Sequence, residues 1–378
     1  MKPKPMPEIE NRLAEFRRKR GIPAVSLARS AGVTRQTIYA IEAGSYIPNT
    51  AVALQLARAL QATVEEVFCL TDDFTAAEPR HEEALSLPGC ELPQPGQPVQ
   101  LCRVDRRLMA IAPSPAPWYL PASDGVVTGK PGKEGKTRVE ILHPEHELGN
   151  RILVAGCDPA ISVLARHLQP AGIELVLVHR NSSQALQLLK QGLVHVAGTH
   201  LKDEASGESN IPEIKRQFLN GAIAVISFSV WEEGIVTARG NPKRIEGIAD
   251  LARPDVSLMN RESGSGSRSL LDSHLKRLRI SGRHVSGYDH IALGHLPAAW
   301  QVRCGAADCC IATRAAAKIY GLSFLPLMSG RYDLAIRKKH LNLPSVQTLL
   351  DALNRSSFRR DLESFGGYDT KTAGQRML

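Results

Sequence analysis

The feature that most constrains this chain is the alternation of short apolar runs with amphipathic segments after residue 150. Arg151–Gly156 and Ile173–Val178 are mainly apolar and have the length of buried strands. Between them, Ile161, Leu164 and Leu168 recur at helical spacing. Such alternation is typical of a parallel α/β sheet covered by helices. We therefore predict an α/β fold for residues 149–378.

Composition separates two further segments ahead of this part. Residues 8–70 are dense in helix formers with short breaks, whereas residues 71–147 are rich in Pro, Gly and turn residues. In the second segment, apolar runs predict two hairpins, 99–104 with 108–111 and 126–128 with 137–142. A length of 378 residues fits two or three domains. We predict three: an all-α domain at 1–72, a small β-rich linker module at 73–148 and the α/β domain at 149–378.

Charge and cysteine content narrow the functional classes. Lys and Arg number 47 against 38 Asp and Glu, a balance that permits a polyanionic partner. The seven cysteines form no C-x-x-C pair, so we expect reduced thiols in a cytoplasmic protein. We expect no secretion segment and no membrane partner. The cysteine spacing fits no usual zinc motif, and neither G-x-S-x-G nor H-E-x-x-H occurs. We therefore predict no catalytic residues, no cofactor, no metal and no enzymatic activity.

The first segment contains a short helix, a glycine turn and a second helix with a polar start. Ser30–Tyr39 spans this turn, with Gly32 in it and Thr34 as a good N-cap. These residues, with Ile41–Gly44 and Pro48, closely resemble the phage-repressor (Xre-type) helix-turn-helix domain. The resemblance implies five helices, the third of which lies in the major groove of double-stranded DNA. A helical protein-interaction module is the alternative.

The resemblance also implies which residues meet DNA. The third helix would present five of them: Thr34, Arg35, Gln36, Thr37 and Tyr39. Gln36 can read adenine, Arg35 can reach guanine or phosphate, and Thr37 can meet a thymine methyl. Four basic residues at the end of the first helix are candidate phosphate contacts: Arg17, Arg18, Lys19 and Arg20. Their alternative role is a solvated turn that complements the helix dipole. The chain departs from the family at Ala24, where a phosphate-bracing Gln is usual.

A second candidate site lies in the α/β part, where serine and glycine alternate between two arginines. This stretch, Arg261–Arg268, joins an apolar strand to the helix that follows. Helix N-termini offer unpaired N–H groups, and ligands of open parallel sheets bind at the carboxyl ends of the strands. The stretch therefore predicts an anion site; a purely structural turn is the alternative.

Several segments of this part carry a second resemblance. They are 194–201, 260–268, 305–311, 321–327, 331–334 and 366–370. Together they resemble the periplasmic-binding-protein-like domain found in cytosolic regulators and beside molybdopterin-biosynthesis domains, and they are similar to molybdate-binding proteins. The resemblance implies two α/β lobes with the ligand between them, and a C-terminal stretch that returns to the first lobe.

By position, the resemblance implies a set of ligand-binding residues. They are Asp158, Ser182, Ser183, Thr199, His200, Arg261, Ser263, Ser265, Gly266, Ser267, Arg268, Tyr288 and Asp308. Hydroxyl and backbone N–H groups can hold a tetrahedral oxyanion, with an arginine as countercharge. The implied ligand is molybdate or tungstate, followed by sulfate-like anions and then by a small organic acid or a molybdopterin-related metabolite. Core packing for His200 and Tyr288, and helix capping for Asp308, are the structural alternatives.

These observations favour a ligand-responsive transcription regulator. The N-terminal domain would bind a pseudo-palindromic operator as a homodimer, and the α/β domain would sense a small anion by lobe closure. Two alternatives stay open: an enzyme or molybdenum-cofactor maturation factor that uses the cleft, and a sensor of a small organic metabolite.

Overall fold

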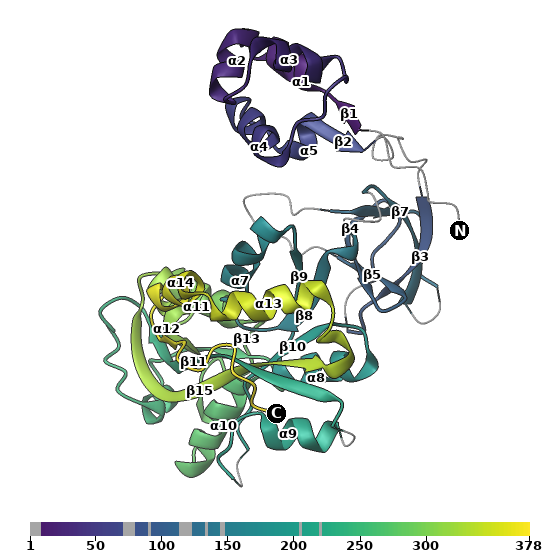
Figure 1. The fold of residues 1–378 in the computed structure, drawn as a ribbon. Helices are drawn as coiled ribbons and strands as arrows, with labels where there is room; N and C mark the ends of the chain where they lie inside the picture. The colour runs from purple at the N-terminus through teal and green to yellow at the C-terminus, as the bar shows by residue number, and fades with distance from the viewer. Residues whose placement is uncertain are drawn as a thin grey trace. The chain divides into compact units, whose positions relative to one another are not determined.

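The computed structural model of the chain is shown in Figure 1. The described residues are 9–70, 80–89, 92–112, 123–132, 135–143, 148–203, 206–218 and 221–378. The chain divides into two compact units, residues 1–78 and 79–378. In the described part, no helix is long and apolar enough to cross a membrane.

The N-terminal unit has the five helices that the sequence predicts. They are α1 (Leu13–Lys19), α2 (Ala24–Ser30), α3 (Arg35–Glu42), α4 (Thr50–Ala59) and α5 (Val64–Val67). Leu27, Ile38 and Leu56 are fully buried between them. The Thr34 hydroxyl accepts a hydrogen bond from the Thr37 N–H at 3.1 Å, so Thr34 is the N-cap of α3 as predicted.

The ends of this unit are strands, although residues 8–70 are dense in helix formers throughout. Strand β1 (Ile9–Asn11) pairs antiparallel with β2 (Phe68–Leu70). The Arg12 N–H donates to the Val67 carbonyl at 2.8 Å and continues the junction. Pairing with a segment about 60 residues away decides the conformation here, and local periodicity does not report such pairing.

The middle segment forms a closed five-stranded barrel, with strand order β3-β5-β4-β6-β7. Its strands are β3 (Arg80–Ser86), β4 (Pro98–Val104), β5 (Arg107–Ile111), β6 (Gly125–Val127) and β7 (Lys136–Ile141). Both predicted hairpins are present, because β4 pairs antiparallel with β5 and β6 pairs antiparallel with β7. Val99, Leu101 and Val139 are fully buried in the barrel core.

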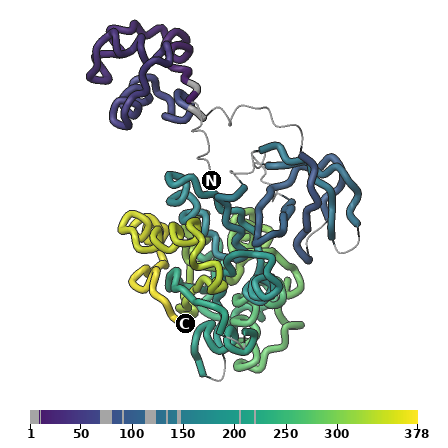
Figure 2. Tube along the Cα trace, turned by 45° about the vertical axis from the view of Figure 1, so that its right-hand side comes forward, coloured from purple at the N-terminus to yellow at the C-terminus, as the bar shows by residue number. Residues whose placement is uncertain are grey.

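The barrel packs directly on the α/β part, as Figure 2 shows. Cys102 and Met109 belong to the same apolar cluster as Leu189 of the α/β part. The buried Arg151 guanidinium lies 2.6 Å from Asp124 Oδ2 and donates to the Leu101 carbonyl at 2.9 Å. The three predicted segments therefore form two compact units, and the boundaries at 72 and 148 stay predictions.

The α/β part is built on one nine-stranded sheet, with strand order β13-β12-β14-β11-β15-β10-β8-β9 and β16 paired to β11. The strands are β8 (Arg151–Gly156), β9 (Glu174–His179), β10 (Val196–Thr199), β11 (Ile223–Thr237), β12 (Leu258–Arg261), β13 (Ile291–Ala292), β14 (Cys309–Thr313), β15 (Ser323–Arg337) and β16 (Tyr368–Asp369). The 15-residue strands β11 and β15 pair antiparallel over their whole lengths. They run through both halves of the sheet and so connect two lobes.

Helices complete the two lobes. The first lobe has α7 (Ile161–Leu168), α8 (Ser182–Gln191), α9 (Ile211–Gln217), α13 (Pro344–Asn354) and α14 (Ser356–Ser364), and the second has α10 (Gly266–Arg277), α11 (His295–Arg303) and α12 (Arg314–Ile319). Short 3₁₀ helices are η3 (Gln169–Ala171), η4 (Ile248–Ala252), η5 (Gly282–His284) and η6 (Lys338–His340). Helices α13 and α14 share an apolar cluster with α7. The predicted two-lobed fold, with a C-terminal return to the first lobe, is confirmed.

Candidate functional site

Helix α3 separates a buried face from the face predicted to read DNA. Ile38 and Ile41 are fully buried, whereas Arg35 and Gln36 are exposed and Tyr39 is 44% exposed. The Arg35 guanidinium donates to the Tyr39 hydroxyl at 3.0 and 3.2 Å. The predicted reading residues therefore lie on the solvent side of one helix, which is the arrangement that a major groove requires.

The predicted phosphate contacts do not all have the same surroundings. Arg17 makes a two-pronged ion pair with Glu42 at 2.5 and 3.0 Å, and both side chains are largely buried. This pair fastens α1 to α3. Arg18, Lys19 and Arg20 are exposed at the end of α1. The structure therefore gives Arg17 a bracing position within the unit and leaves the other three in reach of solvent.

The α/β part gathers a second site where strands of both lobes end. Cys157 follows β8, His200 follows β10, and Arg261 ends β12. All three are buried. The Nδ1 atom of His200 lies 3.6 Å from Cys157 Sγ and 3.3 Å from Ser182 Oγ, and Ser182 Oγ accepts from the His200 N–H at 3.0 Å. The carboxyl ends of parallel strands are where this fold class binds ligands.

His200 lies in an aromatic pocket between the lobes. Its ring centroid is 4.7 Å from Trp231 and 6.0 Å from both Tyr332 and His295. A Cβ atom at Gly266 would lie 2.2 Å from His200 Nε2, so the first turn of α10 packs tightly against the ring. Burial, followed by the Arg261 charge, lowers the pKa of His200 to about 3. The imidazole is therefore neutral near pH 7.

The second lobe contributes a buried chain of charged groups. The Arg261 guanidinium, 1% exposed, pairs with Glu262 at 3.0 and 3.1 Å and donates to Ser267 Oγ at 3.4 Å. The Ser267 hydroxyl in turn donates to Glu233 on β11. Burial raises the pKa of Glu233. The Arg261 guanidinium therefore pairs directly with Glu262 and is connected to Glu233 through Ser267.

Asp158 anchors the turn after β8. Its Oδ1 accepts from the Ala160 N–H at 2.8 Å and from the Tyr368 hydroxyl at 2.7 Å. Burial raises the pKa of Asp158 to about 7. The Tyr332 hydroxyl accepts from the Cys157 N–H at 3.2 Å. Tyrosines of β15 and β16 thus fix the backbone that presents Cys157 and Asp158.

A cavity of about 960 Å³ opens beside this cluster, lined by both lobes and both crossing strands. Four basic residues line it, Lys202, Lys276, Arg277 and Arg331, against the carboxyl groups of Asp203 and Glu233. Apolar side chains of Trp231, Leu270, Leu327 and Met328 complete the wall. We call this cavity the interlobe cleft. Its volume is within the range of pockets for small-molecule ligands.

Two contacts join the lobes near the cleft. Asn181, the N-cap of α8, donates from Nδ2 to the Ser263 carbonyl at 3.2 Å. His179 Nε2 lies 4.0 Å from Glu262 Oε1. These contacts connect the first lobe to the loop ahead of α10, so they depend on the closed arrangement of the lobes.

The structure brings part of the predicted ligand set together. Asp158, Ser182, His200, Arg261, Ser265, Gly266 and Ser267 lie at strand ends or in the first turns of α8 and α10. Ser265 is the N-cap of α10, where its hydroxyl accepts from the Arg268 N–H and donates to the Glu262 carbonyl. Ser263 is exposed and contributes its carbonyl to the contact with Asn181. Thr199 bonds to Asn210 at 3.3 Å and supports the end of β10.

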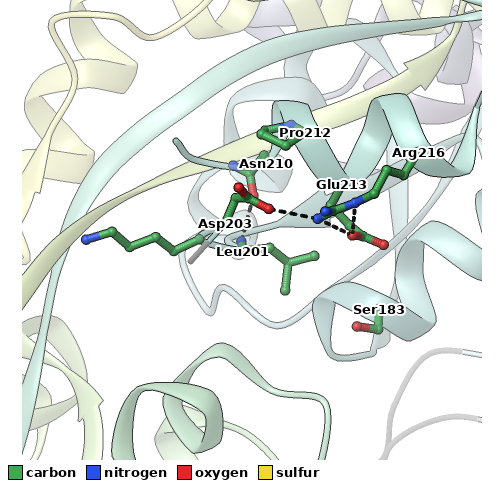
Figure 3. A pocket seen from close by; sticks show the side chains of 8 residues that line it. Ser183, Leu201, Asp203, Asn210, Pro212, Glu213 and Arg216 are labelled. Carbon is green, nitrogen blue, oxygen red and sulfur yellow. Dashed lines mark hydrogen bonds and ion pairs between the residues drawn. The ribbon is translucent and has the colours of Figure 1, made fainter. Parts of the chain in front are cut away.

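Ser183 lies outside this group. It is exposed and lines a different hollow of about 500 Å³, shown in Figure 3. The same hollow contains Arg216, which pairs with Asp203 at 3.0 Å and Glu213 at 2.8 Å. Consecutive helical residues point about 100° apart, so burying Ser182 turns Ser183 away.

Arg268 and Tyr288 form a separate cluster with Asp272. The Arg268 guanidinium lies 4.0 Å from the Tyr288 ring centroid and 3.1 Å from Asp272, and the Tyr288 hydroxyl donates to Asp272 at 2.6 Å. Both predicted side chains are thus engaged with one another beside α10. Neither residue lines the interlobe cleft.

Asp308 lies apart from the rest of the predicted ligand set. Its carboxylate accepts from the backbone N–H and the hydroxyl of Ser257, both at 2.8 Å, just ahead of β12. Strands β12 and β14 are parallel, with Leu258 opposite Cys309. Asp308 therefore lies at the amino end of these strands, roughly 10 Å along the strand from the carboxyl end that carries Arg261. It holds two strands together, close to the capping role that was the alternative.

Sequence reasoning missed several residues of the site. Glu233 and Trp231 lie on crossing strand β11, His295 begins α11, and Cys157 follows β8. Glu233 carried a usable signal, because it is a carboxyl group inside a strand of otherwise largely apolar residues. His295 carried none, since its position beside His200 depends on the fold of the second lobe.

Comparisons with known proteins agree with this architecture. Residues 165–354, half of the chain, match the PBP superfamily domain, and residues 13–67 match a helix-turn-helix domain. The chain is 32% identical over 247 residues to the uncharacterized protein YvgK of Bacillus subtilis, which covers 65% of this chain and 79% of that protein. It is 37% identical over 65 residues to the uncharacterized HTH-type transcriptional regulator YgzD of the same organism, 17% of this chain and 98% of that one.

Among solved structures, the chain is similar to a putative phosphate ABC transporter substrate-binding protein with bound phosphate from Clostridium perfringens. The identity is 12% and the TM-score is 0.45, over 58% of this chain and 98% of that chain. Assignment to a family rests on the sequence matches, which cover the two parts of the chain separately. The chain therefore belongs to the PBP superfamily, as a helix-turn-helix transcriptional regulator with a ligand-binding domain of that family.

Proposed function

We propose that the protein is a one-component regulator that senses a small anion in the interlobe cleft and binds an operator as a homodimer. It would act in the cytoplasm, where the operator is. The observation that carries the proposal is the cleft itself, which is lined by both lobes and carries more basic than acidic side chains. A ligand held by both lobes stabilises their closed arrangement.

The charge of the cleft favours an anion. Asp203 is already paired with Arg216 at 3.0 Å, whereas Lys202 and Lys276 are exposed on the cleft. Gly266, in the first turn of the 12-residue helix α10, lines the same cleft. Helix N-termini attract anions through their free N–H groups and the helix dipole. The two lysines and the N-terminus of α10 would therefore both attract an anion into the interlobe cleft.

Molybdate or tungstate is the first ligand to test. Ser209 and Ser269 line the cleft, and hydroxyl and N–H donors suit a tetrahedral oxyanion. The shape of the cleft also supports a second candidate, an elongated organic anion. The residues of α10 that line the cleft extend from Gly266 at its start to Arg277 at its end, and a helix of this length spans about 18 Å.

Closure provides the route from ligand to DNA. The contacts of Asn181 with Ser263 and of His179 with Glu262 join the lobes beside the cleft. A ligand that binds the closed form better shifts the lobes toward it by its difference in affinity. In a dimer, such a shift would change the spacing or orientation of the two α3 helices.

A ligand panel tests the proposal. Molybdate, tungstate, sulfate, phosphate and small carboxylates are added to the purified full chain, and both melting temperature and operator affinity are measured. A ligand specific to the folded state raises the melting temperature by mass action. We expect one anion class to raise it and to change operator affinity. If no anion changes either quantity, the anion-sensing proposal is wrong.

Gly266→Ala supplies the variant arm of this test. The new Cβ atom would lie 2.2 Å from His200 Nε2 and 3.0 Å from the His200 carbonyl, so α10 has to move away from the first lobe. We expect roughly 10- to 100-fold weaker anion binding, about 1.4 kcal/mol per factor of ten. Gly149→Ala is the matched control, because a Cβ atom there meets nothing within 4 Å.

A further inference from the structure

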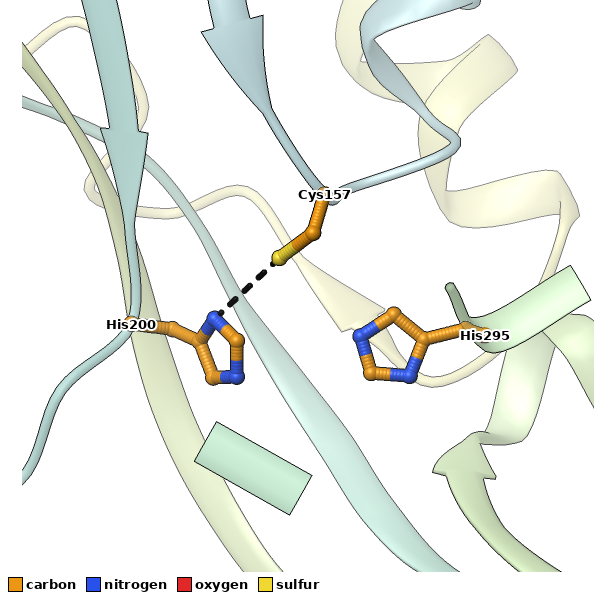
Figure 4. A group of neighbouring side chains, drawn as sticks. All are labelled: Cys157, His200 and His295. Atoms are coloured by element: carbon orange, nitrogen blue, oxygen red, sulfur yellow. Dashed lines mark hydrogen bonds between the residues drawn. The ribbon is translucent and has the colours of Figure 1, made fainter. Parts of the chain in front are cut away.

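Three potential metal ligands meet at His200, which also lines the interlobe cleft. Cys157, His200 and His295 each offer one ligand atom, and these atoms all lie within 4.8 Å of one another. Figure 4 shows the thiol and the two rings turned toward a common point. All three residues are buried, and His295 is 1% exposed. Among the described residues, this is the one group of its kind.

The histidines of this group have nitrogen atoms without partners. Neither ring nitrogen of His295 makes a hydrogen bond, and neither does Nε2 of His200. A buried polar atom without a partner costs roughly 1–3 kcal/mol, so native proteins rarely keep one without a reason. A single ion would take one nitrogen from each ring, so the His295 ring, whose two nitrogens both lack a partner, is the clearest indication that a further group completes this site.

The geometry and the charges suit a cation with a preference for sulfur. Cys157 Sγ and His200 Nδ1 are 3.6 Å apart, close to the roughly 3.5 Å between two ligands of a tetrahedral zinc ion with bonds of about 2.3 and 2.0 Å. The Arg261 charge is balanced by Glu262 at 3.0 Å. Glu233 Oε1 lies 4.0 Å from His295 Nδ1, so a carboxyl group is near the ring without a hydrogen bond to it.

The chemistry of the three side chains agrees with this assignment. A metal binds cysteine as the thiolate and histidine as the neutral imidazole. Cysteine sulfur with two imidazoles is a donor set of zinc and copper(I).

We propose that Cys157, His200 and His295 bind one zinc ion that links the two lobes. Cys157 and His200 belong to the first lobe and His295 to the second, so the bound ion favours the closed cleft. Cys157 loses its proton to solvent as the sulfur–metal bond forms, both imidazoles bind as neutral ligands, and no electron is transferred. The site lies beyond the basic part of the cleft and does not depend on which anion binds there.

Cobalt(II) is the probe for this site. Tag-free full-length protein is reduced, freed of metal with a chelator and titrated with cobalt(II). We expect one ion per chain, a sulfur-to-cobalt charge-transfer band, displacement by zinc and release of one proton per ion. Cys157→Ser should abolish the band and the proton release. His295→Gln should weaken binding by at least roughly 10- to 100-fold, the range seen even for changes in supporting residues.

Cys304→Ser is the matched control, because Cys304 is an exposed free cysteine outside the group. It should leave the titration unchanged. A band that persists in Cys157→Ser, or the absence of any band in a protein whose melting curve is normal, would overturn the proposal. The anion panel is run on the same samples, so anion binding without cobalt binding would refute the metal site alone. Cobalt binding without an anion response would refute anion sensing alone.

Discussion

The two candidate sites of this protein are built in opposite ways. The face predicted to read DNA consists of residues within one short stretch, Thr34 to Tyr39, from the N-cap and first turns of a single helix. The second candidate site lies between the lobes and consists of Cys157, His200, Arg261 and His295, which belong to four separate elements in two lobes. A site on one helix follows from helical periodicity, whereas a site at strand ends follows only from the order of strands in the sheet.

Lowering the pH should distinguish the stability of the C-terminal unit from that of the N-terminal unit most clearly. The first 80 residues contain no histidine, whereas His195 is buried beside the barrel, and its ring packs on His340, which bonds to Asp105 at 3.0 Å. Burial, followed by the His340 charge, lowers the pKa of His195 from 6.5 to about 4. The unfolded chain therefore binds this proton first, and stability present above pH 6.5 is lost as the pH falls to 4. The loss is about 3 kcal/mol.

His195→Asn isolates this contribution. The Asn oxygen can accept the Leu153 N–H that His195 Nδ1 accepts now at 3.0 Å, and it does not titrate. Urea unfolding of both proteins at pH 7.5, 5.5 and 4.5 gives the free energy of unfolding of the C-terminal unit. The wild-type protein should lose stability on acidification relative to the variant. Parallel pH profiles would mean that His195 has an ordinary pKa.

The sequence predicted the fold better than it predicted the site. Helical spacing, the Thr34 cap and the strand–helix alternation each depend on neighbours in the chain, and all three were confirmed. A strand pattern does not say which end of a strand faces the ligand, so the sequence did not show that Asp308 lies at the end opposite Arg261. His295 was missed because its contact with His200 is made only after the second lobe has folded.

Removing one base-reading side chain should cost the next largest amount. Gln36 is exposed on α3, and a bidentate contact to a base contributes about 1–3 kcal/mol of discrimination. We expect Gln36→Ala to weaken specific operator binding by roughly 5- to 150-fold, with less change on random DNA. Fluorescence anisotropy measures both. Gln55→Ala, an exposed glutamine on α4, is the control and should bind normally. Equal losses for both variants would contradict the assignment of α3.

Arg17 and Arg18 distinguish bracing from phosphate contact. Arg17→Met breaks a largely buried ion pair to Glu42, so the helical unit should lose about 1–2 kcal/mol of stability. Arg18→Met should leave stability within about 0.5 kcal/mol and reduce the salt slope of DNA binding by about one. Thermal unfolding and anisotropy at several salt concentrations provide the two readouts. The reverse pattern would place Arg17 on DNA.

The smallest effect on ligand binding is expected at Asp308. This residue lies at the amino ends of its strands, so changing it tests whether the ligand site is confined to the carboxyl ends. Asp308→Ala leaves the N–H and hydroxyl of Ser257 without their carboxylate partner, which should cost roughly 1–2 kcal/mol of stability. Because Asp308 lies at the amino ends of β12 and β14, anion affinity should stay within about twofold of wild type, a change of about 0.4 kcal/mol.

Ser267→Ala, at the opposite end of the same lobe, should weaken anion binding, because its hydroxyl connects Arg261 to Glu233. An affinity loss at Asp308 as large as that at Ser267 would mean that the ligand is read through the whole lobe rather than at the strand ends.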